Sequence, residues 1–240
     1  MTWSIVAREA DGALGVAVAS RFFAVGSLCP YAGRAAGAVS TQALVNPSYG
    51  PATLERLAAG SSAEDALAAL VAGDAGAAHR QVHAVDRNGR AAAFTGEACL
   101  PWSGHATYDG FSVAGNMLAG ASVLDETARA FREHAQLAFA LRLIVAMQAG
   151  EAAGGDRRGK QAAALLVITT EDYPVLDLRV DDHAEPLTEL RRLYDVSLER
   201  FQPFVACLPS RARPAGITDR AEIERAIERF QQARAASATR

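Results

Sequence analysis

The chain has 240 residues, half of them hydrophobic, and its 24 basic and 27 acidic residues give a net charge of −3. This balance is typical of a globular protein, and the length suits one domain of ordinary or slightly large size. The sequence has no basic block typical of nucleic-acid binding, no polybasic stretch for an anionic membrane surface, and no apolar run of bilayer length. We therefore expect a protein that binds neither nucleic acids nor membranes.

The first two predicted strands form a hairpin. Residues 2–8 alternate between two faces, and a turn then leads into a second strand over residues 13–20. One face of the first strand is formed by Thr2, Ser4 and Val6. One face of the second strand consists of glycine and alanine, which predicts close packing against a helix or a neighbouring sheet. A third strand is expected within residues 33–42.

Helices and hairpins alternate along the rest of the chain. Two helices are expected within 47–60 and 61–74, because helical apolar spacing is followed by a glycine in each. The further expected elements are a hairpin at 80–96, a strand at 110–116, one bent helix or two within 122–148, a hairpin formed by 160–170 with 176–180, and an amphipathic helix at 186–201.

Hairpins separated by helix pairs predict an α+β fold with antiparallel sheets between helical layers, because the βαβ units of a parallel sheet are absent. We place the end of this domain at residue 202. Residues 203–240 contain a linker rich in proline and arginine, followed by a short charged helix that fades into a disordered tail.

The cysteines and histidines indicate neither a disulfide framework nor a cofactor. Cys29, Cys99 and Cys207 are far apart, and without a leader peptide they predict reduced thiols in the cytoplasm. Cys29 is also a candidate reactive thiol. On a strand His79 and His83 would share one face, but they have no third ligand, so we expect no metal. Because dinucleotide and phosphate-loop motifs are also missing, we expect no other cofactor.

Thr2 is the candidate nucleophile. Because threonine is small, the initiator methionine ahead of it is a suitable substrate for methionine aminopeptidase, which would leave Thr2 with a hydroxyl and a free α-amine. A hydroxyl beside its own base is one way to activate a nucleophile. A chain that retains Met1 lacks this amine, and the mechanism then fails.

Five stretches in chain order carry a resemblance to a known family: TWSIVAR, LGVAVASRFFAVG, GAVSTQALVNPSYGP, GFSVAGNMLAG and GGDRRGKQAAALLV. From Thr2 to about Phe201 the sequence resembles the bacterial and archaeal family called domain of unknown function 1028, with the N-terminal-nucleophile (Ntn) hydrolase fold. Its topology is also similar to that of proteasome β-subunits, in which a leading hairpin starts with threonine. The resemblance implies a four-layer αββα sandwich of antiparallel sheets, with the first strand opening into a cleft.

The same resemblance implies catalytic roles around Thr2. Arg21 follows the second strand and is the candidate cation that keeps the α-amine neutral, with a surface salt bridge as its structural alternative. Asn116 is the candidate side-chain donor to the oxyanion, and the backbone amides around Thr41 and Gln42 are the candidate second donor.

The cleft would be completed by residues of two loops. Asp156 and Arg157 would orient the amine or bind a substrate carboxylate, or else form an ion pair that braces their loop. Asn46, Ser48 and Tyr49 would line the cleft, or else cap the helix that follows them.

The sequence therefore predicts an amidohydrolase that cleaves a small amide or peptide-like substrate and forms a homodimer or a larger homo-oligomer. Two alternatives remain open. One is a non-catalytic ligand-binding or oligomeric scaffold on the same fold, and the other is a thiol enzyme that uses Cys29.

Overall fold

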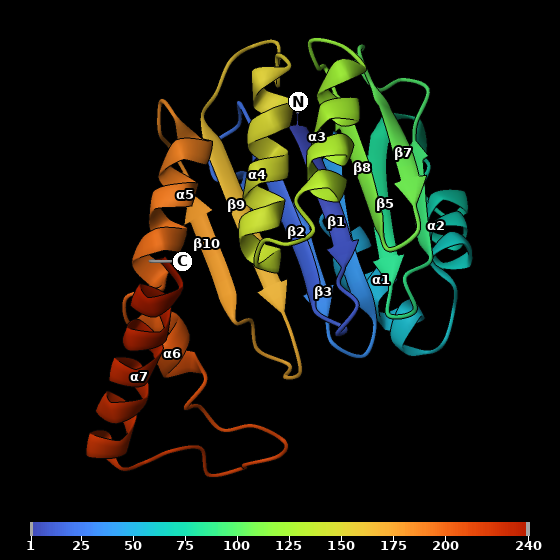
Figure 1. Ribbon diagram of the computed structural model, residues 1–240. Helices are drawn as coiled ribbons and strands as arrows, with labels where there is room; N and C mark the ends of the chain where they lie inside the picture. The colour runs from blue at the N-terminus through green and yellow to red at the C-terminus, as the bar shows by residue number, and fades with distance from the viewer. Residues whose placement is uncertain (1, 239–240) are drawn as a thin grey trace. The chain divides into compact units, whose positions relative to one another are not determined.

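The computed structural model describes residues 2–238, and the chain divides into a larger compact unit that ends at Arg191 and a smaller one that begins at Arg192. The larger unit contains two antiparallel sheets (Figure 1). The strands of one sheet are, in spatial order, β10 (Leu176–Val180), β9 (Ala162–Ile168), β2 (Leu14–Ser20), β1 (Thr2–Arg8), β8 (Phe111–Asn116) and β7 (Gly104–Tyr108). The strands of the other are β3 (Pro30–Gly33), β4 (Gly37–Ala43), β5 (Arg80–Asp86) and β6 (Ala91–Thr95).

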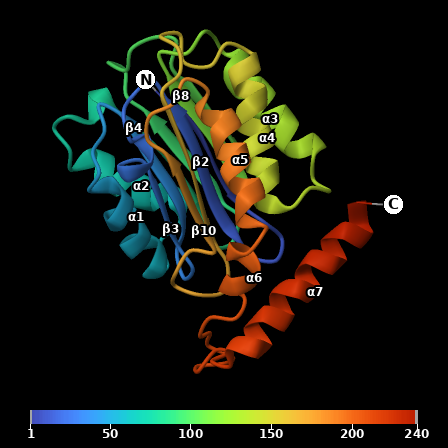
Figure 2. The same cartoon turned by 90° about the vertical axis from the view of Figure 1, so that its left-hand side faces the viewer.

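Helices cover the outer faces of both sheets. The helices of the larger unit are α1 (Tyr49–Ala58), α2 (Ala63–Ala72), α3 (Ser122–Glu133), α4 (Phe139–Ala152) and α5 (Pro186–Ser197), which continues into the smaller unit. Figure 2 shows α1 and α2 on one side of the paired sheets and α3 and α4 on the other. The sheets contact each other through β1 with β4 and β5 with β8. The predicted antiparallel α+β fold is confirmed.

The alternation of β1 and β2 explains how the two sheets pack. They form the predicted hairpin, with Trp3 opposite Ala19. Their shared inner face packs against the second sheet in a cluster of Val6, Leu14, Val16, Ala38 and Val85. The glycine- and alanine-rich face of β2 packs against α4, where a Cβ added at Gly15 would lie 2.5 Å from Cδ1 of Leu143. The predicted close neighbour of this face is therefore a helix.

The predictions missed β3 and β7, and both are edge strands. Their sequences, PYAG and GHATY, are short and lack alternating large apolar residues, so neither carries a clear strand signal. The strand expected within 33–42 is β4, which ends at Ala43, and the first residues of that range form the turn after β3. His79 lies in a 3-10 helix (Ala77–His79) before β5, so the expected shared strand face with His83 is wrong.

The smaller unit contains α6 (Phe201–Val205), which the sequence did not predict, and the predicted charged helix, α7 (Arg220–Ala238). Arg200 donates from Nη1 to Oε2 of Glu224 at 2.8 Å, which ties α7 to the segment before α6. The expected domain boundary after residue 202 remains a prediction, and the expected tail after residue 238 lies outside the described residues. Within residues 2–238, every helix is too short or too polar to cross a membrane.

Candidate functional site

Polar side chains replace apolar ones on part of the face where the two sheets meet. They alternate along four strands as Thr2 and Ser4 on β1, Ser40 and Gln42 on β4, Gln81 and His83 on β5, and Ser112 and Asn116 on β8, and all are buried. The strand register places Thr2 opposite Asn116 in one sheet and Gln42 opposite Gln81 in the other. Because buried polar groups are costly without partners, this region must form a connected hydrogen-bond network.

Gln81 is the centre of that network. Its Oε1 accepts hydrogen bonds from Nε2 of Gln42 at 2.8 Å and from Nδ2 of Asn116 at 3.0 Å. Its Nε2 donates to Oγ1 of Thr95 at 2.8 Å and to the carbonyl of Gly115 at 2.9 Å. One side chain thus connects the two sheets and fixes the orientation of both amides beside Thr2.

His83 lies deeper in the same network. Its Nε2 lies 2.7 Å from Oγ of Ser4 and its Nδ1 lies 3.1 Å from Oγ of Ser112. Burial, with a smaller contribution from the charge of His105, lowers the pKa of His83 to about 3. The imidazole is therefore neutral at physiological pH and holds strands of both sheets together.

Thr2 lies at the edge of the network, where β1 begins, and only 5% of its surface is exposed. Its Oγ1 donates to Oγ of Ser20 at 3.1 Å. Thr2 lines a pocket of about 190 Å³, together with Phe22, Val25, Leu28, Cys29, Gln42, Ala43, Leu44 and Val45. The hydroxyl is thus held in place beside a mostly apolar cavity.

A second pocket, of about 340 Å³, lies next to the first. It is lined by Ala43, Leu44, His79, Ala98, Cys99, Leu100, Asn116 and Met117. The two pockets share Ala43 and Leu44, so Thr2 and Asn116 face neighbouring cavities. Most of the lining side chains are apolar, which is typical of small-molecule sites.

Backbone strain is concentrated around these pockets. Ala24, Ala43 and Met117 adopt positive φ angles of 52°, 69° and 52°, in the region that favours glycine. Each such residue costs about 1–3 kcal/mol, and this kind of strain clusters at functional sites. Ala43 and Met117 both line the second pocket, so two of these three strained residues lie in a pocket wall.

The loop after α4 contains the acidic candidate, and hydrogen bonds brace it. Oδ2 of Asp156 accepts from the backbone amide of Arg21 at 2.8 Å and from Nη2 of Arg158 at 3.1 Å. The Nη1 of Arg21 donates to the carbonyl of Arg158 at 2.6 Å. The ion pair expected between Asp156 and Arg157 has a different partner, because Asp156 pairs with Arg158 while Arg157 is exposed on the same loop.

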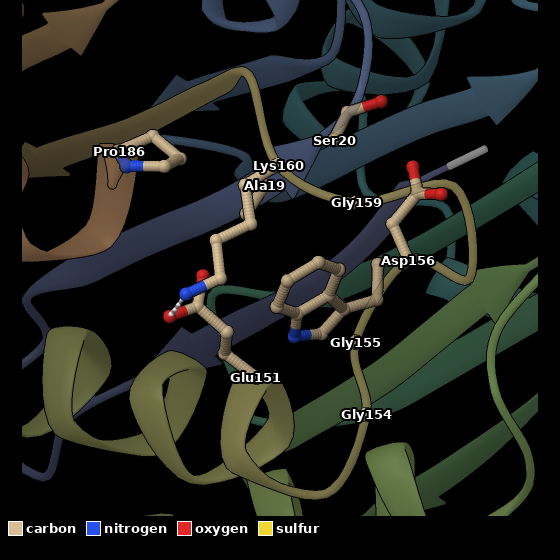
Figure 3. A pocket seen from close by; sticks show the side chains of 10 residues that line it. Ala19, Ser20, Glu151, Gly154, Gly155, Asp156, Gly159, Lys160 and Pro186 are labelled. Carbon is tan, nitrogen blue, oxygen red and sulfur yellow. Dashed lines mark ion pairs between the residues drawn. The ribbon is translucent and has the colours of Figure 1, made fainter. Parts of the chain in front are cut away.

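This loop forms one wall of a small cavity of about 70 Å³ on the helix-covered side of β1 and β2. Figure 3 shows Ser20 and Asp156 at one end of the cavity and the ion pair between Lys160 and Glu151 at the other. Asp156 and Ser20, the partner of the Thr2 hydroxyl, therefore lie at the same end of the sheet.

The cleft residues predicted after β4 form a separate cluster around Asp74. Oδ2 of Asp74 accepts from Tyr49 Oη at 3.0 Å, from Arg80 Nε at 3.1 Å and from Asn46 Nδ2 at 3.4 Å. Hydrogen bonds, first from the Gly76 amide and then from Arg80, lower the pKa of Asp74 to about 2. The contacts of Asn46 and Tyr49 hold the β4–α1 loop in place, and neither residue is part of the pocket wall around Thr2.

The groups that the sequence predicts as hydrogen-bond donors to the oxyanion already donate hydrogen bonds within the protein. The backbone amide of Thr41 donates to the carbonyl of Cys29 at 3.1 Å, and the Thr41 hydroxyl donates to that of Asn46 at 3.1 Å. Besides its bond to Gln81, Asn116 Nδ2 donates to the Thr2 carbonyl at 3.4 Å, which is longer than a strong hydrogen bond. One amide hydrogen of Asn116 therefore makes only a weak hydrogen bond.

Cys29 lies in the wall of the Thr2 pocket. Its side chain is buried, and burial raises the pKa of its thiol to about 12. A cysteine nucleophile reacts as the thiolate and needs a lowered pKa. The environment of Cys29 therefore disfavours the thiol-enzyme alternative.

Our prediction from the sequence missed Ser20 and Gln81. The hairpin register could have located Ser20, because Trp3 pairs with Ala19 and the next residues outward are Thr2 and Ser20. For Gln81 the available signal was a polar residue two positions before His83, in a strand whose remaining interior residues are Val82, Ala84 and Val85. Neither signal shows that the two sheets bring Gln81 against Asn116.

The fold and site define a class of α+β proteins in which two antiparallel sheets enclose a polar network that ends at paired apolar pockets. Residues 2–190 match the family of unknown function DUF1028, and the chain belongs to that family, as the sequence motifs predicted. The crystal structure of protein SPO2555 from Silicibacter pomeroyi, of the same family, is 33% identical, with a TM-score of 0.85 over 91% of this chain and 96% of that one. No curated protein matches the chain.

Proposed function

We propose that this protein is an amidohydrolase with the four-layer αββα sandwich of Ntn hydrolases, and that Thr2 is its nucleophile after Met1 is removed. The observation that carries this proposal is the position of Thr2. It begins a central strand, its hydroxyl lies 3.1 Å from that of Ser20, and its side chain lines a pocket. The helix, sheet, sheet, helix order of the larger unit supports the same reading.

The reaction would proceed in two halves. The α-amine of Thr2 takes the hydroxyl proton as Oγ1 bonds to the amide carbonyl carbon, and the proton then passes to the leaving nitrogen as the C–N bond breaks. The amine product departs, and the acyl group remains bonded to Thr2 as an ester. A water molecule, deprotonated by the same amine, attacks this ester, and the carboxylic acid departs as Oγ1 regains its proton.

The surrounding residues would support these steps. The two positive charges of Arg21 and Arg158 exceed the single negative charge of Asp156. A positive surrounding favours the neutral form of the α-amine, whose ordinary pKa is about 7.7–8.0. Asn116 Nδ2 would give up its weak hydrogen bond to the Thr2 carbonyl and donate to the oxyanion instead. Arg157, exposed on the same loop, would contact a polar end of the substrate.

Two parts of the β4 segment would shape the cavity. Gln42 lines the pocket and would contact the substrate, with its amide oriented by Gln81. Thr41, Asn46 and Tyr49 would act indirectly, by holding the loop that contains Leu44.

We propose a small-molecule amide as substrate and the cytoplasm as location, with no nucleic-acid or membrane partner. Self-association into a homodimer or larger oligomer is supported by the exposed Phe23.

The experiment combines the intact mass of freshly purified protein with a screen of small amides. We expect loss of Met1 and turnover of an amide, with Thr2→Ala lowering kcat/KM by about 10²-fold or more and Thr2→Ser retaining part of it. Thr107→Ala, an exposed threonine on the edge strand β7, is the matched control. An active protein that retains Met1, or a Thr2→Ala variant with wild-type activity, would refute the proposal.

The second candidate, a non-catalytic ligand-binding protein or oligomeric scaffold on the same fold, is favoured by the occupied donors. The Thr41 amide is bonded to Cys29, and both hydrogens of Asn116 Nδ2 have partners. This candidate predicts retention of Met1, saturable ligand binding and no acylation of the protein by reactive esters.

A further inference from the structure

The pocket around Thr2 has an apolar character that restricts what it can bind. Among the described residues, none of its lining side chains carries a charge, and only Thr2 and Gln42 present oxygen or nitrogen atoms from their side chains. Phe22 and Leu44 are 52% and 63% exposed and line the same pocket, so they form part of an exposed apolar patch. A ligand that covered them would remove apolar surface from water.

We propose that this pocket binds a neutral apolar acyl group of about six non-hydrogen atoms, so that the substrate is an amide of a short apolar carboxylic acid. The inference rests on the proposed function and names its substrate class. During the reaction the acyl group is bonded to Thr2 Oγ1, so it must occupy the cavity that Thr2 itself lines. The neighbouring pocket is lined by Asn116 and not by Thr2, and it receives the leaving amine.

The dimensions and the electrostatics of the pocket agree with this assignment. A volume of about 190 Å³ takes about six non-hydrogen atoms, at ~30 Å³ for each water-sized group. Cys29 in the wall is a neutral thiol, because burial raises its pKa to about 12. A carboxylate in this cavity would lose hydration without gaining a cationic partner from the lining side chains. Acyl groups that end in a charge are therefore excluded.

The first test measures binding, so that it does not depend on catalysis. Acetamide, hexanamide and succinamate are titrated by calorimetry into the Thr2→Ala variant, which lacks the proposed nucleophile and cannot hydrolyse them. Each added methylene should strengthen binding up to about fourfold, so hexanamide should bind at least tenfold more tightly than acetamide, and succinamate should not bind measurably. Equal affinities for the two neutral amides, no binding of hexanamide, or a preference for succinamate would overturn the assignment.

The second test locates the binding. In the same Thr2→Ala background, Leu28→Trp, which enlarges a half-buried wall residue, should weaken hexanamide binding at least tenfold. The control Phe201→Trp, an exposed residue outside the pocket wall, should leave binding unchanged. Equal losses in both variants, or none in Leu28→Trp, would overturn the location. If Leu28→Trp does not fold, the ligand series of the first test still decides the acyl preference.

Hydrolysis of acetyl and hexanoyl p-nitroanilides by the wild-type protein then separates the two proposals. Turnover that favours the hexanoyl substrate supports both, and turnover that favours the acetyl substrate overturns the acyl assignment alone. Hexanamide binding without turnover of any anilide would count against the amidohydrolase and leave the apolar pocket assigned.

Discussion

Replacing His83 with glutamine should change how the stability of the protein depends on pH. His83 is fully buried, and burial is the main cause that lowers its pKa from 6.5 to about 3. As the pH falls below 6.5 the unfolded chain binds a proton at this histidine, whereas the native protein does not until about pH 3. The free energy of unfolding should therefore decrease with falling pH throughout this window.

The pKa difference sets the size of the effect. Each pH unit below 6.5 costs ~1.36 kcal/mol, so the contribution of His83 to the loss of stability at pH 5 is about 2 kcal/mol. Urea unfolding, followed by circular dichroism at pH 7.5 and pH 5, measures this loss. His83→Gln should lose about 2 kcal/mol less than the wild-type protein between the two pH values, whatever its stability at pH 7.5.

His183→Gln is the control, because His183 is exposed on the surface. Its stability should change with pH in parallel with the wild-type protein. If His83→Gln also follows the wild-type protein in parallel, the imidazole is not the neutral, dehydrated group that its contacts with Ser4 and Ser112 indicate.

Two further predictions concern the stability of the core, one through hydrogen bonds and one through packing. Gln81→Leu leaves the buried amides of Gln42 and Asn116 without their shared acceptor and should lower the free energy of unfolding by about 2–5 kcal/mol in a urea titration. A loss below 0.5 kcal/mol would contradict its central role. Gly15→Ala places a Cβ 2.5 Å from a side-chain carbon of α4 and should cost about 1–3 kcal/mol, whereas Gly73→Ala, with its nearest atoms at 3.7 Å, should cost little. Equal thermal midpoints for the two glycine variants would refute this packing argument.

Local patterns predicted those elements that carry their own signal. The β1–β2 hairpin followed from alternation on both sides of a turn, and α2 from a capping serine before helical spacing, since Ser62 accepts a hydrogen bond from the Asp65 amide. The strands β3 and β7 were missed because their segments, PYAG and GHATY, lack the alternating large apolar residues that mark a strand such as β10. Among the site residues, Asn116 was correctly placed at the end of a strand. The pairing that sets it opposite Thr2 was not predicted.

The sequence by itself determined the antiparallel α+β class, the family and the two faces of β1, because alternation, turn residues and motifs are properties of contiguous residues. Only the tertiary structure decided that Gln81 and Gln42 of one sheet meet Asn116 of the other, and that Asn46 and Tyr49 bind Asp74. These contacts join segments far apart in the chain, and they depend on how the sheets stack and on where buried polar groups find partners.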